Sequence, residues 1–183
     1  MTGWTTAAAG ALWFFAVPAA AEEVVFRGYP LQALAERWGA GVALGLTSVG
    51  FGCLHFLNPE SSWLGAANVA AAGAWLGVVM LRTGSLWWAS AAHLGWNWAH
   101  GFLADLPVSG LDVVDAPYVA ARAVGPEWLS GGGFGPEGSL LSTVALAAGA
   151  VWAWRTGWLK PSRAVREAVP LALMEGPETD GAE

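Results

Sequence analysis

The stretch Ala21-Glu22-Glu23-Val24-Val25-Phe26-Arg27-Gly28 places two adjacent carboxylates and an arginine directly after an almost uncharged apolar run that begins near Gly3. If this run continues as a helix, Glu23 and Arg27 are four residues apart and can pair on one face. Glu22 then points about 100° away, so the arginine leaves it free. A free carboxylate in a low-dielectric layer is a candidate general base, and the alternative is a charged cap where a membrane helix meets water.

The composition is typical of an integral membrane protein. Hydrophobic residues make up 55% of the 183 residues, charged residues make up only 12%, and there are 13 tryptophans, a residue enriched at membrane interfaces. The net charge of −6 provides no basic surface for nucleic acid. Residues 3–21 end in small residues that resemble a signal-peptide cleavage site. Because no Lys or Arg precedes Arg27, we expect a retained membrane helix instead.

Five apolar segments are long enough, or nearly so, to span the roughly 30 Å of hydrocarbon in a bilayer. They lie near residues 4–26, 40–57, 63–81, 85–104 and 139–159. Pro30 is expected to break or kink the first segment, and Leu31 to Trp38 is predicted to be a short amphipathic helix. The predicted fold is therefore an all-α, polytopic membrane helix bundle with about five transmembrane helices. Its core covers residues 1–160, and residues 161–183 form a partly disordered cytoplasmic tail.

Charges in the connections predict the orientation of the chain. Basic residues follow the first, third and fifth segments, which are alternate connections, as the positive-inside rule requires. We therefore expect the N-terminus outside and the C-terminus in the cytoplasm. The long connection at about residues 105–138 contains several prolines and three consecutive glycines. It is either a lid or an extramembrane linker, and the linker is the preferred interpretation.

All three histidines of the chain lie on apolar segments. His55 is late in the second segment, and His93 and His100 are in the fourth, where Asn97 shares a face with His93. Ionisable groups at membrane depth are costly and usually face a cavity or a partner. A single histidine of this kind would more often be structural. Three of them, together with an asparagine and a carboxylate pair, predict a functional site.

The depth of these residues in the membrane restricts how they can meet. Glu22 is close to the cytoplasmic end of its predicted span, whereas His55 is far along the second. Either the first segment extends deeper, through Gly28 to the amphipathic helix, or the second segment starts late, after Gly41.

Three short motifs occur in order along these segments: Glu22-Glu23-x-x-x-Arg27, Phe51-x-x-x-His55 and His93-x-x-x-Asn97. Together they resemble the signature of the CPBP intramembrane proteases, also called the CAAX prenyl protease or Abi family. Phe26-Arg27-Gly28 is similar to the family's usual Phe-Arg-Gly after the glutamates. The resemblance covers residues 22–97 and implies an intramembrane endopeptidase that hydrolyses a peptide bond at the membrane.

The resemblance also implies catalytic roles. Glu22 would be the base that activates water, and His55 would position or deprotonate that water. His93 and Asn97 would donate hydrogen bonds to the oxyanion of the tetrahedral intermediate, for which an imidazole N–H and an amide are suitable donors.

Supporting roles follow from the same resemblance. Glu23 and Arg27 would be structural partners that hold the helix and its base in place. Phe51 would pack beside the ring of His55, or it is an ordinary core or lipid-facing aromatic. His100 lies outside the motifs and is expected to support the site from behind or to lie at the membrane interface.

The need for a metal is open at this point. Glu22, His55 and His93 would form a three-ligand zinc site with one position left for water in a metalloprotease. Asn97 is a poor zinc ligand but a good oxyanion donor, which favours a glutamate-type mechanism that requires no cofactor.

Other functions also stay open. The expected setting is a bacterial plasma membrane, and the expected partner is a peptide or protein substrate there, prenylated or not. The first alternative is a non-catalytic membrane partner or immunity-type protein of the same fold. A weaker alternative is a proton- or metal-coupled transporter, which five spans without an internal repeat do not favour.

Overall fold

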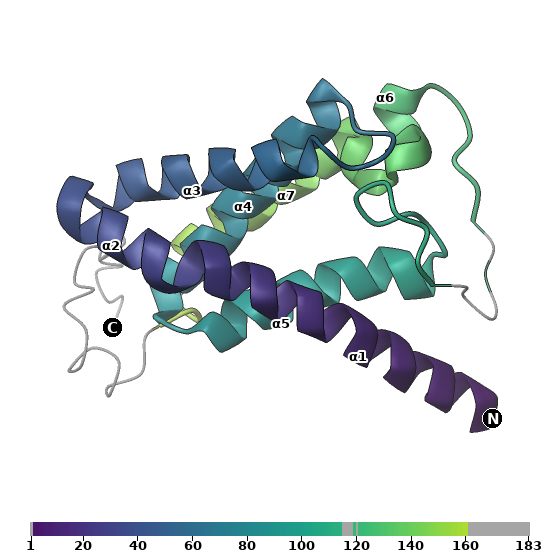
Figure 1. Cartoon of the computed structure of the whole chain (residues 1–183), viewed down its shortest axis with the longest axis horizontal. Coiled ribbons are helices and arrows are strands. Elements are labelled where there is room, and N and C mark those ends of the chain that lie inside the picture. The colour runs from purple at the N-terminus through teal and green to yellow at the C-terminus, as the bar shows by residue number, and fades with distance from the viewer. Residues whose placement is uncertain (1, 115–118, 120, 161–183) are drawn as a thin grey trace, which may run out of the picture.

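The fold is taken from a computed structural model that describes residues 2–114, 119 and 121–160. The predicted cytoplasmic tail, residues 161–183, lies outside the described residues. Within them the regular secondary structure is helical, apart from one isolated bridge between Val108 and Leu111 (Figure 1). The predicted all-α fold is confirmed.

Each predicted apolar segment contains one long helix. The elements in chain order are α1 (Thr2–Glu23), the π-helical turn η1 (Val24–Gly28), α2 (Tyr29–Trp38), α3 (Ala40–His55), α4 (Trp63–Thr83), α5 (Leu86–Trp98), the π-helical turn η2 (Ala99–Leu103), α6 (Glu127–Ser130), the 3₁₀ turns η3 (Gly132–Phe134) and η4 (Pro136–Gly138), and α7 (Leu140–Arg155). The predicted amphipathic helix is α2, which buries only Leu31 and Ala35.

Length and composition support two of the five predicted spans as membrane-crossing helices. The helical stretches Gly3–Trp38 and Trp63–Thr83 are long and apolar enough to cross a bilayer. The helices α3 and α7 are apolar but have only 16 residues each. The structure therefore bears out a helical membrane protein without fixing the number of crossings.

The first segment stays helical past Pro30. The π-helical turn η1 precedes this proline, which falls at the start of α2. Proline is tolerated there because the first N–H groups of a helix have no partner within the helix, so the missing N–H costs no hydrogen bond. The chain then turns back at Gly39, whose φ of 84° lies in the left-handed region that glycine reaches freely. Of the two expected effects of Pro30, the break is absent, because the helical path extends from Gly3 to Trp38, whereas the backbone is distorted just before the proline, at Gly28, whose ψ of −114° is not helical.

The long helices pack mainly in pairs. Helix α4 lies between α3 and α7, whereas α1 packs along α5 (Figure 1). The helices α3 and α4 approach so closely that a Cβ on Gly52 would lie 2.6 Å from the carbonyl oxygen of Ala66. Small residues at such a crossing are typical of helices that pack in lipid.

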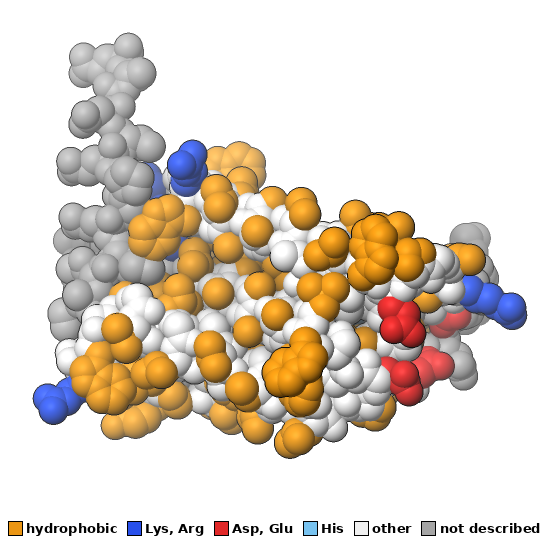
Figure 2. Space-filling model, turned by 90° about the horizontal axis from the view of Figure 1, so that it is seen from above, with side chains coloured by type: hydrophobic (Ala, Val, Ile, Leu, Met, Phe, Trp, Pro, Cys, Tyr) orange, Lys and Arg blue, Asp and Glu red, His pale blue; other side chains and the backbone are white. Residues whose placement is uncertain are grey.

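The two ends of the bundle differ in charge. Hydrophobic side chains cover its length, and the acidic side chains gather toward one end, with one basic side chain among them (Figure 2). Arg37, Arg82 and Arg155 fall in the last turns of α2, α4 and α7, and Arg82 Nη2 donates to the carbonyl of Thr156 at 3.0 Å. This asymmetry agrees with the charge pattern from which the orientation is predicted.

Candidate active site

The predicted ion pair between Glu23 and Arg27 is present and fully buried. Arg27 Nη1 donates to Glu23 Oε1 at 3.0 Å, and both side chains have 0% exposure. Arg27 Nη2 donates to the carbonyl of Gly73 at 2.9 Å, which ties η1 to α4. A Cβ on Gly73 would lie 3.2 Å from that same Nη2, so a glycine leaves room for the guanidinium.

Phe51 is the aromatic centre of the site. Its ring lies 4.5 Å from the His55 ring and 6.0 Å from the His93 ring, and the Arg27 guanidinium carbon stands 4.5 Å above it. Only 2% of Phe51 is exposed. The expectation that Phe51 packs beside the His55 ring is confirmed, and its lipid-facing alternative is wrong.

Each histidine of the site is anchored through its Nδ1. His55 Nδ1 lies 2.9 Å from the Phe51 carbonyl, and His93 Nδ1 lies 2.9 Å from Glu23 Oε1. A carbonyl and an arginine-paired carboxylate both accept hydrogen bonds, so in each ring Nδ1 carries the proton. The Nε2 of each neutral ring is therefore an acceptor with a free lone pair.

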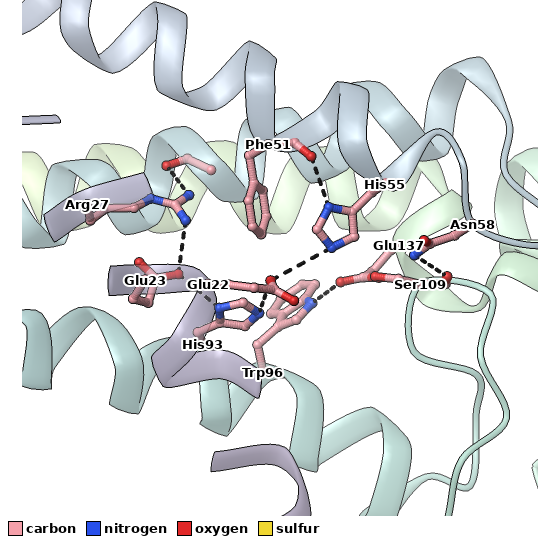
Figure 3. A network of polar contacts seen from close by, with 11 residues as sticks. Glu22, Glu23, Arg27, Phe51, His55, Asn58, His93, Trp96, Ser109 and Glu137 are labelled. Carbon is pink, nitrogen blue, oxygen red and sulfur yellow. Dashed lines mark hydrogen bonds and ion pairs between the residues drawn. The ribbon is translucent and has the colours of Figure 1, made fainter. Parts of the chain in front are cut away.

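Both free nitrogens face the carboxylate of Glu22. Glu22 Oε2 is 3.8 Å from His55 Nε2 and 3.8 Å from His93 Nε2 (Figure 3). This oxygen is buried and accepts no hydrogen bond from the described residues. Three acceptor atoms from α1, α3 and α5 thus converge with no donor among them. Such an arrangement calls for a proton, a water molecule or a cation at their meeting point.

Of the two expected ways for Glu22 to meet His55, the fold adopts the first, which is an extended first segment. The first segment continues through η1 and α2, and α3 already begins at Ala40. The π-helical turn directly follows Glu23, and such turns occur often at functional sites. Glu22 and His55 thus meet in a fold whose first helical path extends beyond Gly28.

The fit of this donor set to zinc is incomplete. A carboxylate and two imidazoles whose Nδ1 atoms are held by acceptors are suitable ligand types. However, the 3.8 Å between Glu22 Oε2 and each Nε2 exceeds the roughly 3.4 Å expected between two donors on one tetrahedral zinc. Among the described residues, no group of three or more His, Cys, Asp or Glu side chains is placed to hold a metal ion.

A small cavity adjoins the two histidines. Phe51, His55 and His93 line one part of it, and α4 contributes Val69, Ala72 and Leu76. The remaining wall includes Trp96, Ser109 and Glu137. Two of these, Ser109 and Glu137, come from the connection predicted to be a linker.

The linker interpretation is wrong for two parts of that connection. Phe134 is 1% exposed, Glu137 is 5% exposed and Ser109 is 9% exposed, so the segments that carry them pack into the protein. These contacts join residues far apart in sequence, so no local pattern predicted them. Asn68, a polar residue within an apolar span, is a signal that was available, and its side chain donates to the carbonyl of Glu137.

Asn97 and His100 are less closely joined to the site. Asn97 lies one turn beyond His93 on α5, is half-buried and does not line the cavity. His100 is buried beside Trp96, with ring centroids 5.5 Å apart, and its Nε2 has no hydrogen-bond partner among the described residues. His100 therefore lies behind Trp96 in the cavity wall.

Fold and site together define a helical membrane protein with carboxylate and imidazole groups converging in its interior. A model of the family described as type II CAAX prenyl endopeptidase Rce1-like matches residues 4–99, more than half of the chain. The chain belongs to this family, and all of the motif residues fall within the match. No curated protein and no solved structure matches it. The family is one of CAAX-type intramembrane endopeptidases, which act on a protein or peptide at the membrane.

Proposed function

We propose that the protein is an intramembrane endopeptidase in which Glu22 activates a water molecule for attack on a peptide bond. The observation that supports this is the convergence of Glu22 Oε2 with the Nε2 atoms of His55 and His93, each 3.8 Å away. A water molecule bound there has two hydrogens to donate, one to the carboxylate and one to an imidazole. The site thus holds a nucleophile next to its base.

The hydrolysis then proceeds as general base catalysis. Glu22 takes one proton from the water, while the second hydrogen stays on the oxygen and donates a hydrogen bond to His55 Nε2, which orients the attack. The water oxygen bonds to the carbonyl carbon, and a tetrahedral intermediate forms. When this intermediate collapses, the C–N bond breaks and the proton held by Glu22 passes to the leaving amine.

The oxyanion of that intermediate needs hydrogen-bond donors. Nδ1 of His93 is engaged by Glu23, so the ring can donate only from Nε2, and only when both of its nitrogens carry protons. The Asn97 amide, one helical turn away, would be the second donor. Its position on α5 and its lack of another hydrogen bond to a described residue leave it available.

The remaining parts of the proposal concern the setting. We propose that no metal takes part, that the N-terminus faces outward and that the substrate is a membrane-associated peptide. The wide donor spacing supports the first part, and the basic ends of α2, α4 and α7 support the second.

The test is cleavage of prenylated and unprenylated peptides by the purified protein in detergent, with and without a chelator. We expect cleavage that the chelator leaves unchanged and that His55→Ala abolishes. Loss of cleavage with the chelator, restored by zinc, would overturn the metal-free mechanism. Absence of cleavage, together with a protein that co-purifies whether or not Glu22 is replaced by Ala, would instead identify a non-catalytic membrane partner.

A further inference from the structure

Glu137 is a buried carboxylate that the hydrolysis described above does not use. It lies in η4, and both of its carboxylate oxygens accept hydrogen bonds (Figure 3). Trp96 Nε1 on α5 donates to Oε1 at 2.9 Å, and Ser109 Oγ donates to Oε2 at 2.5 Å. The carboxylate therefore joins two parts of the cavity wall that are 13 residues apart in sequence (Trp96 and Ser109).

The backbone around Glu137 is held separately. Asn68 Nδ2 on α4 donates to the carbonyls of Glu137 at 2.7 Å and Ser139 at 2.8 Å, and Asn68 Oδ1 accepts from Thr143 at 2.7 Å. These bonds fix η4 to α4 without the glutamate side chain. The carboxylate is thus not needed to dock this segment, and its two bonds act on Trp96 and Ser109.

Trp96 is the part of this wall nearest in sequence to the catalytic histidine. It follows His93 by three residues on α5, so the two side chains share one side of the helix. Its indole lines the cavity and packs against the rings of Trp75 and His100, with centroids 6.1 and 5.5 Å away. The indole N–H donates to Glu137, and this bond sets the orientation of the ring.

We propose that Glu137 is a positioning residue for the hydrolysis. Its carboxylate holds the Trp96 indole as the wall against which the substrate packs beside the scissile bond. Glu137 makes no contact with Glu22, so it acts through Trp96 and not on the reacting atoms. This inference rests on the proposed peptidase function, and its effect belongs to substrate binding more than to the chemical step.

Three variants separate hydrogen bonding from charge. Glu137→Ala removes both acceptors, and Trp96→Phe removes the donor and part of the ring while keeping an aromatic side chain. Glu137→Gln keeps the shape: its oxygen accepts from Trp96, and its amide donates to Ser109 Oγ. Glu127→Ala is the matched control, an exposed glutamate of the same connection.

The measurement is kcat and KM for peptide cleavage, expressed per folded protein. We expect Glu137→Ala and Trp96→Phe each to raise KM about tenfold, as for loss of one hydrogen bond to a charged group, with kcat within about twofold. The double variant is expected to have the KM of Glu137→Ala, since that substitution already removes the bond between Trp96 and Glu137. Glu137→Gln and Glu127→Ala are expected to keep the parent KM.

The possible contrary results differ in what they overturn. If the parent cleaves and Trp96→Phe keeps the parent KM, this inference fails while the peptidase function stands. If Glu137→Gln raises KM as much as Trp96→Phe does, the negative charge is required and the proposed positioning role is wrong. If the parent cleaves no peptide, the proposed function itself fails. Should Glu137→Ala not fold, Trp96→Phe and Glu137→Gln still decide the matter.

Discussion

Nδ1 of His93 lies 2.9 Å from Oε1 of Glu23, the same oxygen that accepts a hydrogen bond from Arg27. Two carboxylates adjacent in sequence therefore have different surroundings. Glu23 is completely buried and pairs with both an arginine and a histidine, whereas 36% of the Glu22 side chain is exposed and its Oε2 accepts no hydrogen bond from the described residues. This difference supports the proposal that Glu23 has a structural task and that Glu22 is the base of the reaction.

Substitutions of the two glutamates are expected to differ in their effect on the stability of the protein. Glu23→Gln leaves the Arg27 guanidinium buried without its counter-charge, which typically costs about 3–5 kcal/mol. Glu22→Gln removes no hydrogen bond within the described residues and alters only the 3.8 Å contacts of a partly exposed carboxylate with two imidazoles, so it is expected to change stability by less than about 0.5 kcal/mol. Thermal unfolding of the purified variants in detergent measures the difference. Equal melting temperatures for the two variants would contradict this division of tasks.

The arginine is expected to be irreplaceable by lysine. Arg27 binds Glu23 and the Gly73 carbonyl with two nitrogens while its guanidinium stacks over Phe51. A lysine ammonium is a single point charge and lacks the planar guanidinium with its several N–H donors. Arg27→Lys should therefore lower the free energy of unfolding by about 2 kcal/mol.

The control for this substitution is Arg37→Lys, since Arg37 is exposed in the last turn of α2. We expect it to unfold at the parent temperature. An Arg27→Lys protein as stable as this control would show that a positive charge alone is sufficient.

Two glycines of α3 provide a matched test of the helix contact that places His55. A Cβ on Gly52 would lie 2.6 Å from the Ala66 carbonyl oxygen and 2.8 Å from the Ala70 Cβ, whereas Gly45 has nothing within 4 Å. Gly52→Ala should therefore separate α3 from α4 and cost about 1–3 kcal/mol.

Gly45→Ala is expected to be neutral or to stabilise by up to about 1 kcal/mol, because alanine favours a helix interior over glycine. Both unfolding temperatures and peptide cleavage should be measured. If the two alanine variants behave alike, the close packing of α3 on α4 is not what holds His55 in place.

Much of the fold and of the motif geometry could be predicted because it is encoded locally. Runs of apolar residues predicted the long helices, and the four-residue spacing predicted the pair of Glu23 with Arg27. For Glu23 and Arg27 the partners share one helix, so helical periodicity alone was enough. The place of Phe51 beside His55, one turn along α3, was expected from the resemblance to the protease family.

Contacts between distant segments could not be predicted in this way. Glu137 lies in a connection rich in proline and glycine, where no periodicity indicates burial, and it meets Trp96 from 41 residues away. The π-helical turn η1 between Glu23 and α2 was also not predicted, because such a turn has no clear sequence signal. Both features depend on packing that forms only when the helices are assembled.

The most direct test of the central claim compares Glu22→Gln with Glu36→Gln, a substitution of an exposed glutamate on α2. Cleavage of one membrane peptide by equal amounts of folded parent and variants is followed by mass spectrometry of the products. We predict parent-like cleavage by Glu36→Gln and a loss of about a hundredfold or more in kcat for Glu22→Gln, the loss expected when a general base is removed. Parent-like cleavage by Glu22→Gln would contradict the account.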